Sequence, residues 1–318
     1  MSTMTTTAGL SFELTEEAQS VREMVRDFAE SEIRPIAARI DETHEFPAEN
    51  TKKMAELGLL GMFVPEAHGG AGMSYLAYVV AIEELSRVCA SHGVIASVNN
   101  SLVCYPLMQY ATEAQKQRFL VPMAKGEVLG AFGLTEANAG SDAAGTQTRA
   151  VREGDHWRVN GSKIYITNAS YAKTITFTAV TDPTLGSNGI GAFIMDTGTK
   201  GFRVGKKEKK MGLRGSDTVE VVFEDCLVPA DQVLGEPTGG FKTFMRTLTG
   251  GRISIGALAL GVGGQPAGGD HGHVGRDAFE RANGRGTVHH GHHHVHQDHV
   301  VMTLFEFLEG DRAVIRNV

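Results

Sequence analysis

A chain of 318 residues is long enough for two or three domains, and its 42% of hydrophobic residues can fill a sizeable core. The formal net charge of −7 lacks the basic excess that nucleic-acid binding requires. No apolar run reaches the ~18 residues of a membrane span. Three cysteines without CxxC spacing favour a reducing compartment over structural zinc, so we expect a cytoplasmic protein.

Residues 1–11 have no arginine and no apolar stretch, so they match neither a secretory signal nor a transit peptide, and we expect them to be disordered. Residues 12–126 have the pattern of an α-helical domain. Thr15 precedes two glutamates, as at a capped helix start. Apolar residues then recur at helical spacing, at Val21, Met24, Val25 and Phe28. We interpret the adjacent Glu83 and Glu84 as a solvated helix face, with a paired acid as the alternative.

Residues 127–236 change to short strands that are separated by turns. The expected strands are 129–134, 146–151, 156–160, 162–167, 173–181, 190–196, 201–205 and 218–224. Turn residues such as Glu153-Gly154 lie between them. Short strands at regular spacing predict a β domain of the barrel or sandwich type.

One stretch of this domain, Ala131 to Thr148, reads AFGLTEANAGSDAAGTQT. An apolar run that suits a buried strand breaks into small and turn-forming residues. The hydroxyls of Thr135 and Ser141 and the free backbone amides can point at a polar or anionic ligand. Gly140 lets the main chain approach that ligand closely.

A second stretch, His156 to Ala169, reads HWRVNGSKIYITNA. Its alternation predicts two strands that are joined by a turn at Asn160-Gly161. The second strand ends on an aromatic ring, an apolar spacer and a hydroxyl, which are Tyr165, Ile166 and Thr167. This combination suits a flat heteroaromatic ring that is stacked on one side and hydrogen-bonded at its edge.

Residues 237–263 return to helical spacing, with apolar positions at Phe241, Met245 and Leu248. Residues 264–318 form an atypical tail that is rich in glycine and histidine and has no helical periodicity. Its histidines could hold zinc, nickel or copper loosely. The tail has no cysteine and no fixed ligand spacing, so we expect no built metal site.

The two stretches and a third, GKKEKKMGLRGSDTVEVVFEDCLVPADQVLG from Gly205 to Gly235, follow one another in the order seen in acyl-CoA dehydrogenases. The chain resembles this family over roughly Leu10 to Gly263, and its short-chain (butyryl-type) members most closely. The resemblance implies a multi-domain α and β fold. An N-terminal α-helical domain would precede a middle β-barrel or sandwich domain and a C-terminal helical bundle, which is truncated, missing or frame-shifted after about Gly263.

The resemblance also implies that the middle domain binds FAD and acyl-CoA. The implied FAD contacts are Phe132, Gly133, Leu134, Thr135, Gly140, Ser141, Tyr165, Ile166 and Thr167. The implied substrate contacts are Ser141, Thr249 and Arg252. Family members often carry aspartate where Thr249 stands, and a purely structural role for Arg252 stays open. The basic run Lys206 to Lys210 has two interpretations, a solvated strand end or a partner for coenzyme A phosphates.

The implied activity is that of an oxidoreductase of fatty acid β-oxidation, which desaturates a short-chain acyl-CoA between Cα and Cβ. The electrons would pass through FAD to an electron-transfer flavoprotein, and family members are homotetramers. The last residues, EGDRAVIRNV, echo the family segment that carries the catalytic glutamate, and Ala313 stands in its place. We therefore expect no catalytic base and impaired activity. The alternatives are an inactive relic that binds flavin or acyl-CoA weakly, and a flavin oxidase or monooxygenase of the same fold.

Overall fold

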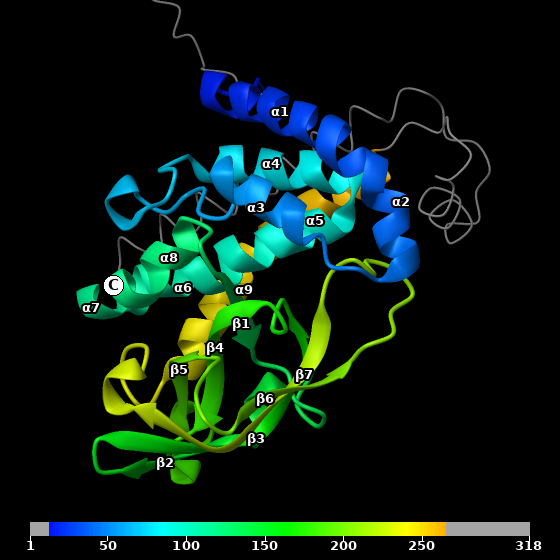
Figure 1. Ribbon diagram of the computed structural model, residues 1–318. Helices are drawn as coiled ribbons and strands as arrows, with labels where there is room; N and C mark the ends of the chain where they lie inside the picture. The colour runs from blue at the N-terminus through cyan, green and yellow to red at the C-terminus, as the bar shows by residue number, and fades with distance from the viewer. Residues whose placement is uncertain (1–12, 265–318) are drawn as a thin grey trace, which may run out of the picture.

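The computed structural model describes residues 13–264, as a layer of helices over a curled sheet, with a final long helix joining the two (Figure 1). The expected fold class, a helical domain followed by a β domain and a further helix, is confirmed. The expectations for residues 1–11 and for the tail after Gly264 lie outside the described residues.

The helical layer occupies the N-terminal part of the described chain. Its α-helices are α1 (Glu16–Phe28), α2 (Arg34–Thr43), α3 (Ala48–Glu56), α4 (Tyr75–Val88), α5 (Ala90–Ser97), α6 (Tyr105–Tyr110), α7 (Glu113–Gln115) and α8 (Val121–Ala124). Thr15 caps α1 by accepting from the Ala18 backbone N–H, as its position predicts. A π-helical segment, Val98–Cys104, continues α5 across the top of the sheet.

In the described part of the chain the sheet has seven strands: β1 (Leu129–Gly133), β2 (Arg149–Glu153), β3 (His156–Thr167), β4 (Ala172–Val180), β5 (Ile190–Asp196), β6 (Phe202–Lys207) and β7 (Thr218–Pro229). Their order is β1-β4-β2-β3-β7-β6, and β5 pairs with the other edge of β4. Only β1 with β4 and the single pair between β2 and β4 run parallel.

The turn that the sequence predicts at Asn160-Gly161 is wrong, because β3 runs through both residues and pairs with β7. The Asn160 amide donates to Asp225 Oδ1 at 3.0 Å and accepts from the Asp225 N–H at 2.9 Å. Gly161 is needed for close approach, since a Cβ there would lie 2.5 Å from Thr148 Oγ1. The other turn, predicted at Glu153-Gly154, is confirmed: it joins β2 to β3, and the φ of Gly154 is 59°.

The last helix, α9 (Gly240–Gly263), packs against α4 and α5 on one side and against β5 on the other (Figure 1). The ring of Phe244 on α9 stacks on Phe132 of β1, with centroids 4.3 Å apart. This contact belongs to an apolar cluster that joins the helical layer to the sheet. The helix and the sheet therefore share a core rather than touching at their edges.

Two asparagine side chains fix the π-helical segment over the sheet. Asn99 donates to the carbonyls of Leu60 and Met123 and accepts from the Gly130 N–H at 2.9 Å. The neighbouring Asn100 accepts from the Met62 N–H. Both side chains are fully buried, so these hydrogen bonds replace the water that their amides lose on folding.

Glu84 contradicts both interpretations made from the sequence, the solvated face and the paired acid. Its side chain is only 3% exposed and lies between α1 and α4. It accepts from Arg26 Nη2 at 2.6 Å and from Arg87 Nε at 2.9 Å. Burial raises the pKa of Glu84, and the hydrogen bonds of the two arginines outweigh that effect and lower it. Long-range ion pairing of this kind leaves no mark in helical periodicity.

A second buried ion pair lies inside the β domain. The Lys163 side chain of β3 is fully buried, and its Nζ lies 2.6 Å from Glu136 Oε1. Burial lowers the pKa of Lys163 to about 8, against the opposing effect of Glu136. Burial raises the pKa of Glu136, but the Lys163 charge and four hydrogen bonds outweigh this and lower it to about 2. The folded protein therefore stabilises the ionised form of Glu136 over its protonated form.

The depressed pKa of Glu136 predicts how stability depends on pH. Its stabilising effect is present above the ordinary carboxyl pKa of 4.5 and is lost as pH falls toward about 2. We expect the loss of unfolding free energy in Glu136→Gln to be largest near neutral pH and to shrink below pH 4.5. Urea titrations at pH 7, 5, 4 and 3 measure it, with the exposed Glu49→Gln as control. A loss that stays constant over this range contradicts the assignment.

Candidate functional site

A cavity of about 390 Å³ opens between the helical layer and the sheet, and it collects most of the residues singled out from the sequence. The predicted residues that line it are Phe132, Leu134, Thr135, Gly140, Ser141, Tyr165, Ile166, Thr167 and Arg252. They come from β1, the loop after it, the end of β3, and α9. The fold thus brings together segments that are more than a hundred residues apart in the sequence.

Gly133 and Thr249, which were also singled out, lie outside this lining. A Cβ at Gly133 would meet Phe177 Cβ at 3.1 Å and Lys163 Cγ at 3.4 Å. Gly133 therefore lies against the sheet interior, one layer beneath the cavity. The Thr249 hydroxyl donates to the Met245 carbonyl of its own helix at 3.2 Å.

The other lining residues form an apolar wall that the sequence analysis did not select, made of Val98, Leu102, Ala143, Met245 and Leu248. Val98 and Leu102 belong to the π-helical segment that Asn99 anchors. Their i, i+4 spacing marks a helix face, but only the packed structure shows that this face looks onto the loop after β1.

Three side-chain hydroxyls are available inside the cavity. Within residues 13–264, those of Thr135, Ser141 and Thr167 make no hydrogen bond to another protein group. Thr135 and Thr167 are half-buried and Ser141 is exposed. Hydroxyls without a protein partner are free to bind a polar ligand edge. Arg252 likewise forms no ion pair within the described residues, which leaves its guanidinium open to an anion or a carbonyl.

Tyr165 occupies an unusual backbone conformation at the mouth of the cavity. Its φ is 60°, and 61% of the residue is exposed, although its neighbour Ile166 is buried. The pairing of β3 with β7 is irregular between Lys163 and Ile166, where Ile164 N–H donates to the Thr135 carbonyl instead. A positive φ costs a non-glycine residue of order 1–3 kcal/mol, so this conformation persists only where the surrounding contacts hold it in place. The bulge turns a flat aromatic ring toward solvent, where a planar ligand can cover it.

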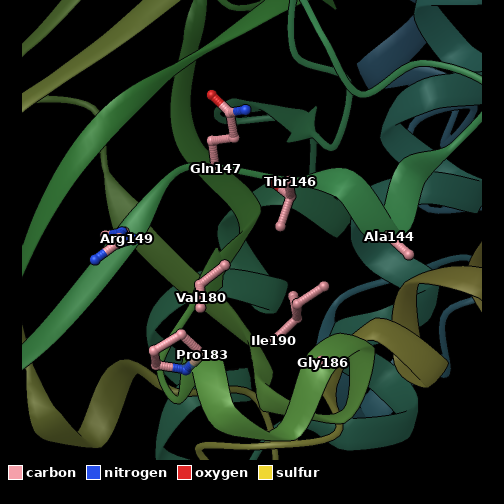
Figure 2. Close-up of a pocket in the computed structure, with 8 residues that line it drawn as sticks. All are labelled: Ala144, Thr146, Gln147, Arg149, Val180, Pro183, Gly186 and Ile190. Carbon is pink, nitrogen blue, oxygen red and sulfur yellow. The ribbon is translucent and has the colours of Figure 1, made fainter.

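A second cavity, of about 490 Å³, lies beside the first and is shown in Figure 2. Its lining consists of Ala144, Thr146, Gln147, Arg149, Val180, Pro183, Gly186 and Ile190. In Figure 2 the loop 183–189 faces the segment that leads into β2. The two cavities are separated by the short turn Ala143–Gly145, since Ala143 lines the first and Ala144 the second.

Among residues 13–264, Arg149 is the single cationic residue in the lining of the second cavity. The basic run Lys206 to Lys210 contributes to neither lining. Lys210 Nζ donates instead to the Ser216 carbonyl at 2.6 Å and to Thr218 Oγ1 at 2.8 Å. These placements agree with a solvated strand end rather than with a phosphate site at either cavity.

Across residues 13–264, the side chains form no cluster of three or more histidine, cysteine or acidic groups suited to a metal ion. In the same range, no helix is both long and apolar enough to cross a bilayer.

Comparison with known proteins identifies the architecture. Residues 15–127 match the model of the acyl-CoA dehydrogenase N-terminal domain, and residues 131–226 match that of the middle domain. The short-chain specific acyl-CoA dehydrogenase of Clostridium acetobutylicum is 53% identical over 253 residues, which are 80% of this chain and 67% of that protein. The chain spans 61% to 67% of the length of three curated relatives that are 50% to 53% identical to it.

Solved structures give the same result. Butyryl-CoA dehydrogenase from Megasphaera elsdenii superposes with a TM-score of 0.79 at 38% identity, covering 96% of this chain and 79% of that one. A chain in the structure of the electron transferring flavoprotein of Acidaminococcus fermentans gives a TM-score of 0.79 at 39% identity, covering 97% and 79%. Both domain matches and the close relatives lead to one conclusion: this chain belongs to the acyl-CoA dehydrogenase family.

Proposed function

We propose that the first cavity binds the flavin ring of FAD and the reacting end of a short-chain acyl-CoA, for α,β-dehydrogenation of that thioester. The observation that carries the proposal is the convergence of three uncommitted hydroxyls and the exposed ring of Tyr165 in one cavity. The 53% identical short-chain relative supports the choice of substrate class.

The residues present fit a flavin. Its ring system is flat and apolar on its faces and carries carbonyl and N–H groups along one edge. The Tyr165 ring and the apolar wall of Val98 and Leu102 suit the faces, and the hydroxyls of Thr135 and Thr167 suit the edge. FAD, when bound, supplies the acceptor for the hydride that leaves the substrate β carbon.

The second cavity fits the polar end of the substrate. An acyl-CoA is long, with an apolar acyl group at one end and phosphates at the other. We infer that it passes over the turn Ala143–Gly145, which separates the two cavities. Arg149 then binds a phosphate oxygen, and Ser141 and Arg252 bind polar atoms nearer the thioester.

Proton removal from the α carbon needs a base, and no carboxylate among residues 13–264 lines the first cavity. With Ala313 in the position that echoes the family glutamate, we propose that this chain binds its ligands but is impaired in turnover. General-base catalysis contributes about 10²–10⁴-fold to such reactions. An inactive relic that binds weakly is the second candidate, and the missing carboxylate is the observation that favours it.

The electron acceptor that we propose is an electron-transfer flavoprotein, with the similar chain from the Acidaminococcus fermentans structure as support. We further propose a cytoplasmic location. The cysteines Cys89, Cys104 and Cys226 are all free thiols, which suits a reducing compartment.

The role of Thr167 is tested by Thr167→Val, which keeps the shape and removes the hydroxyl. Losing one hydrogen bond to the flavin edge costs about 0.5–1.5 kcal/mol, so we expect the Kd for FAD to rise about two- to tenfold. Flavin fluorescence titration measures it. The matched control is Thr43→Val on α2, whose hydroxyl donates to the Arg39 carbonyl far from the cavity. Equal FAD affinity in wild type and Thr167→Val contradicts the assignment.

The role of Arg149 is tested by Arg149→Met. The arginine is exposed, so the lost attraction to a phosphate is worth about 1 kcal/mol, or roughly fivefold in Kd. Calorimetric titration with coenzyme A at low and high salt measures it, and the difference should shrink as salt rises. The control is Arg152→Met on the same strand, outside the cavity lining. If both variants weaken coenzyme A binding equally, Arg149 has no special role.

The proposed lack of a base is tested on the FAD-loaded chain under anaerobic conditions. We expect butyryl-CoA to perturb the visible flavin spectrum, because it binds beside the ring, without bleaching it. Rapid bleaching by butyryl-CoA contradicts the proposed impairment and shows that another carboxylate accepts the proton. A spectrum that does not respond at all favours the relic.

A further inference from the structure

We propose that the buried ion pair Lys163–Glu136 is a positioning pair that sets the walls of both cavities together. The inference deepens the proposed function and rests on it for the identity of the two ligands. Neither residue lines either cavity, so both act through the residues that they hold.

Glu136 closes the loop that carries the polar lining. Its carboxylate accepts from the Thr146 hydroxyl, from the Gln147 N–H at 2.6 Å and from the Thr148 N–H at 3.1 Å. The enclosed loop supplies Gly140, Ser141 and Ala143 to the first cavity. Thr146 and Gln147 line the second. The Glu136 carboxylate therefore holds the loop that contributes residues to the walls of both cavities.

Lys163 joins this loop to the sheet. Its ammonium donates to Thr146 Oγ1 at 2.9 Å, to Thr178 Oγ1 of β4 at 3.1 Å and to the Leu134 carbonyl at 3.3 Å. The residues on either side of this contact, Thr135 after Leu134 and Tyr165 two positions after Lys163, both line the first cavity. The ammonium thus holds the loop end and the β3 bulge against each other.

We infer that removing one of the two residues moves these walls. Removing either partner leaves the other as a buried charge without its counter-ion, which is strongly unfavourable. The remaining group then changes its protonation or admits water. Either change weakens the hydrogen bonds that hold the loop 136–148, which closes over the pair. We therefore infer that the loop opens and that both ligand sites lose their shape at once.

The experiment compares four variants in the full chain. Lys163→Met breaks the pair, the double variant Lys163→Met with Glu136→Gln leaves no buried charge, and Thr178→Val removes a single acceptor. Glu84→Gln is the matched control, because it breaks a buried acid–arginine contact between α1 and α4, far from both cavities. The measurements are amide hydrogen exchange of residues 135–148, thermal midpoint, and Kd for FAD and for coenzyme A.

For Lys163→Met we expect exchange in 135–148 to speed up at least tenfold and both Kd values to rise about tenfold. The double variant should regain thermal stability, but its loop exchange should stay fast and its ligand affinities low. If the pair only stabilised the fold, the double variant would recover the loop protection and the affinities as well. Thr178→Val should show a smaller change of the same kind, and it answers the question if Lys163→Met does not fold. Glu84→Gln should lower the thermal midpoint and leave the loop and both affinities unchanged.

Two results overturn the proposal: loop exchange that is unchanged in Lys163→Met and Thr178→Val, or ligand affinities that fall no more than in Glu84→Gln. If the wild-type chain binds neither FAD nor coenzyme A, the proposed function fails, while hydrogen exchange still decides whether the pair holds the loop. If it binds both and the variants do too, only the positioning role fails.

Discussion

The site depends on the hydrogen bonds of one buried amide, that of Asn99. Its side chain connects Leu60, Met123 and Gly130, and so ties two parts of the helical layer to the first strand of the sheet. A buried amide that loses these partners costs about 1–3 kcal/mol for each group left unpaired. Because Val98 and Leu102 flank Asn99 on the same π-helical segment, the apolar wall of the first cavity inherits its position from these bonds.

The opposite wall is held by charge rather than by an amide. Inside the β domain, Lys163 and Glu136 are cut off from water. Their contact with each other and with the hydroxyls of Thr146 and Thr178 takes the place of the lost hydration. The cavity therefore lies between two polar networks, each buried and each crossing from one element to another. Apolar packing, such as the stack of Phe132 on Phe244, fills the space between them. None of these networks uses the hydroxyls of Thr135, Ser141 and Thr167, which are free for a ligand.

Much of the fold could be predicted from local pattern. The change of periodicity near residue 127 marks the start of the sheet, and the capping threonine of α1 and the turn at Gly154 fall where their residue types place them. The failures have one cause. Asn160-Gly161 has the residue types of a turn, but the Asn160 side chain hydrogen-bonds to Asp225, 65 residues away. Glu84 has the pattern of a surface residue, but Arg26 of another helix covers it.

The candidate site divides in the same way. The sequence by itself determined which short stretches carry the hydroxyls, the glycine and the aromatic ring, because these depend on residue type over a few neighbouring positions. Only the tertiary structure decided that Arg252 and the wall of Val98 and Leu102 face them, that Gly133 lies one layer below, and that Tyr165 sits at positive φ. It alone also revealed the Lys163–Glu136 pair, since a buried lysine is stable only where distant segments supply its counter-ion and acceptors.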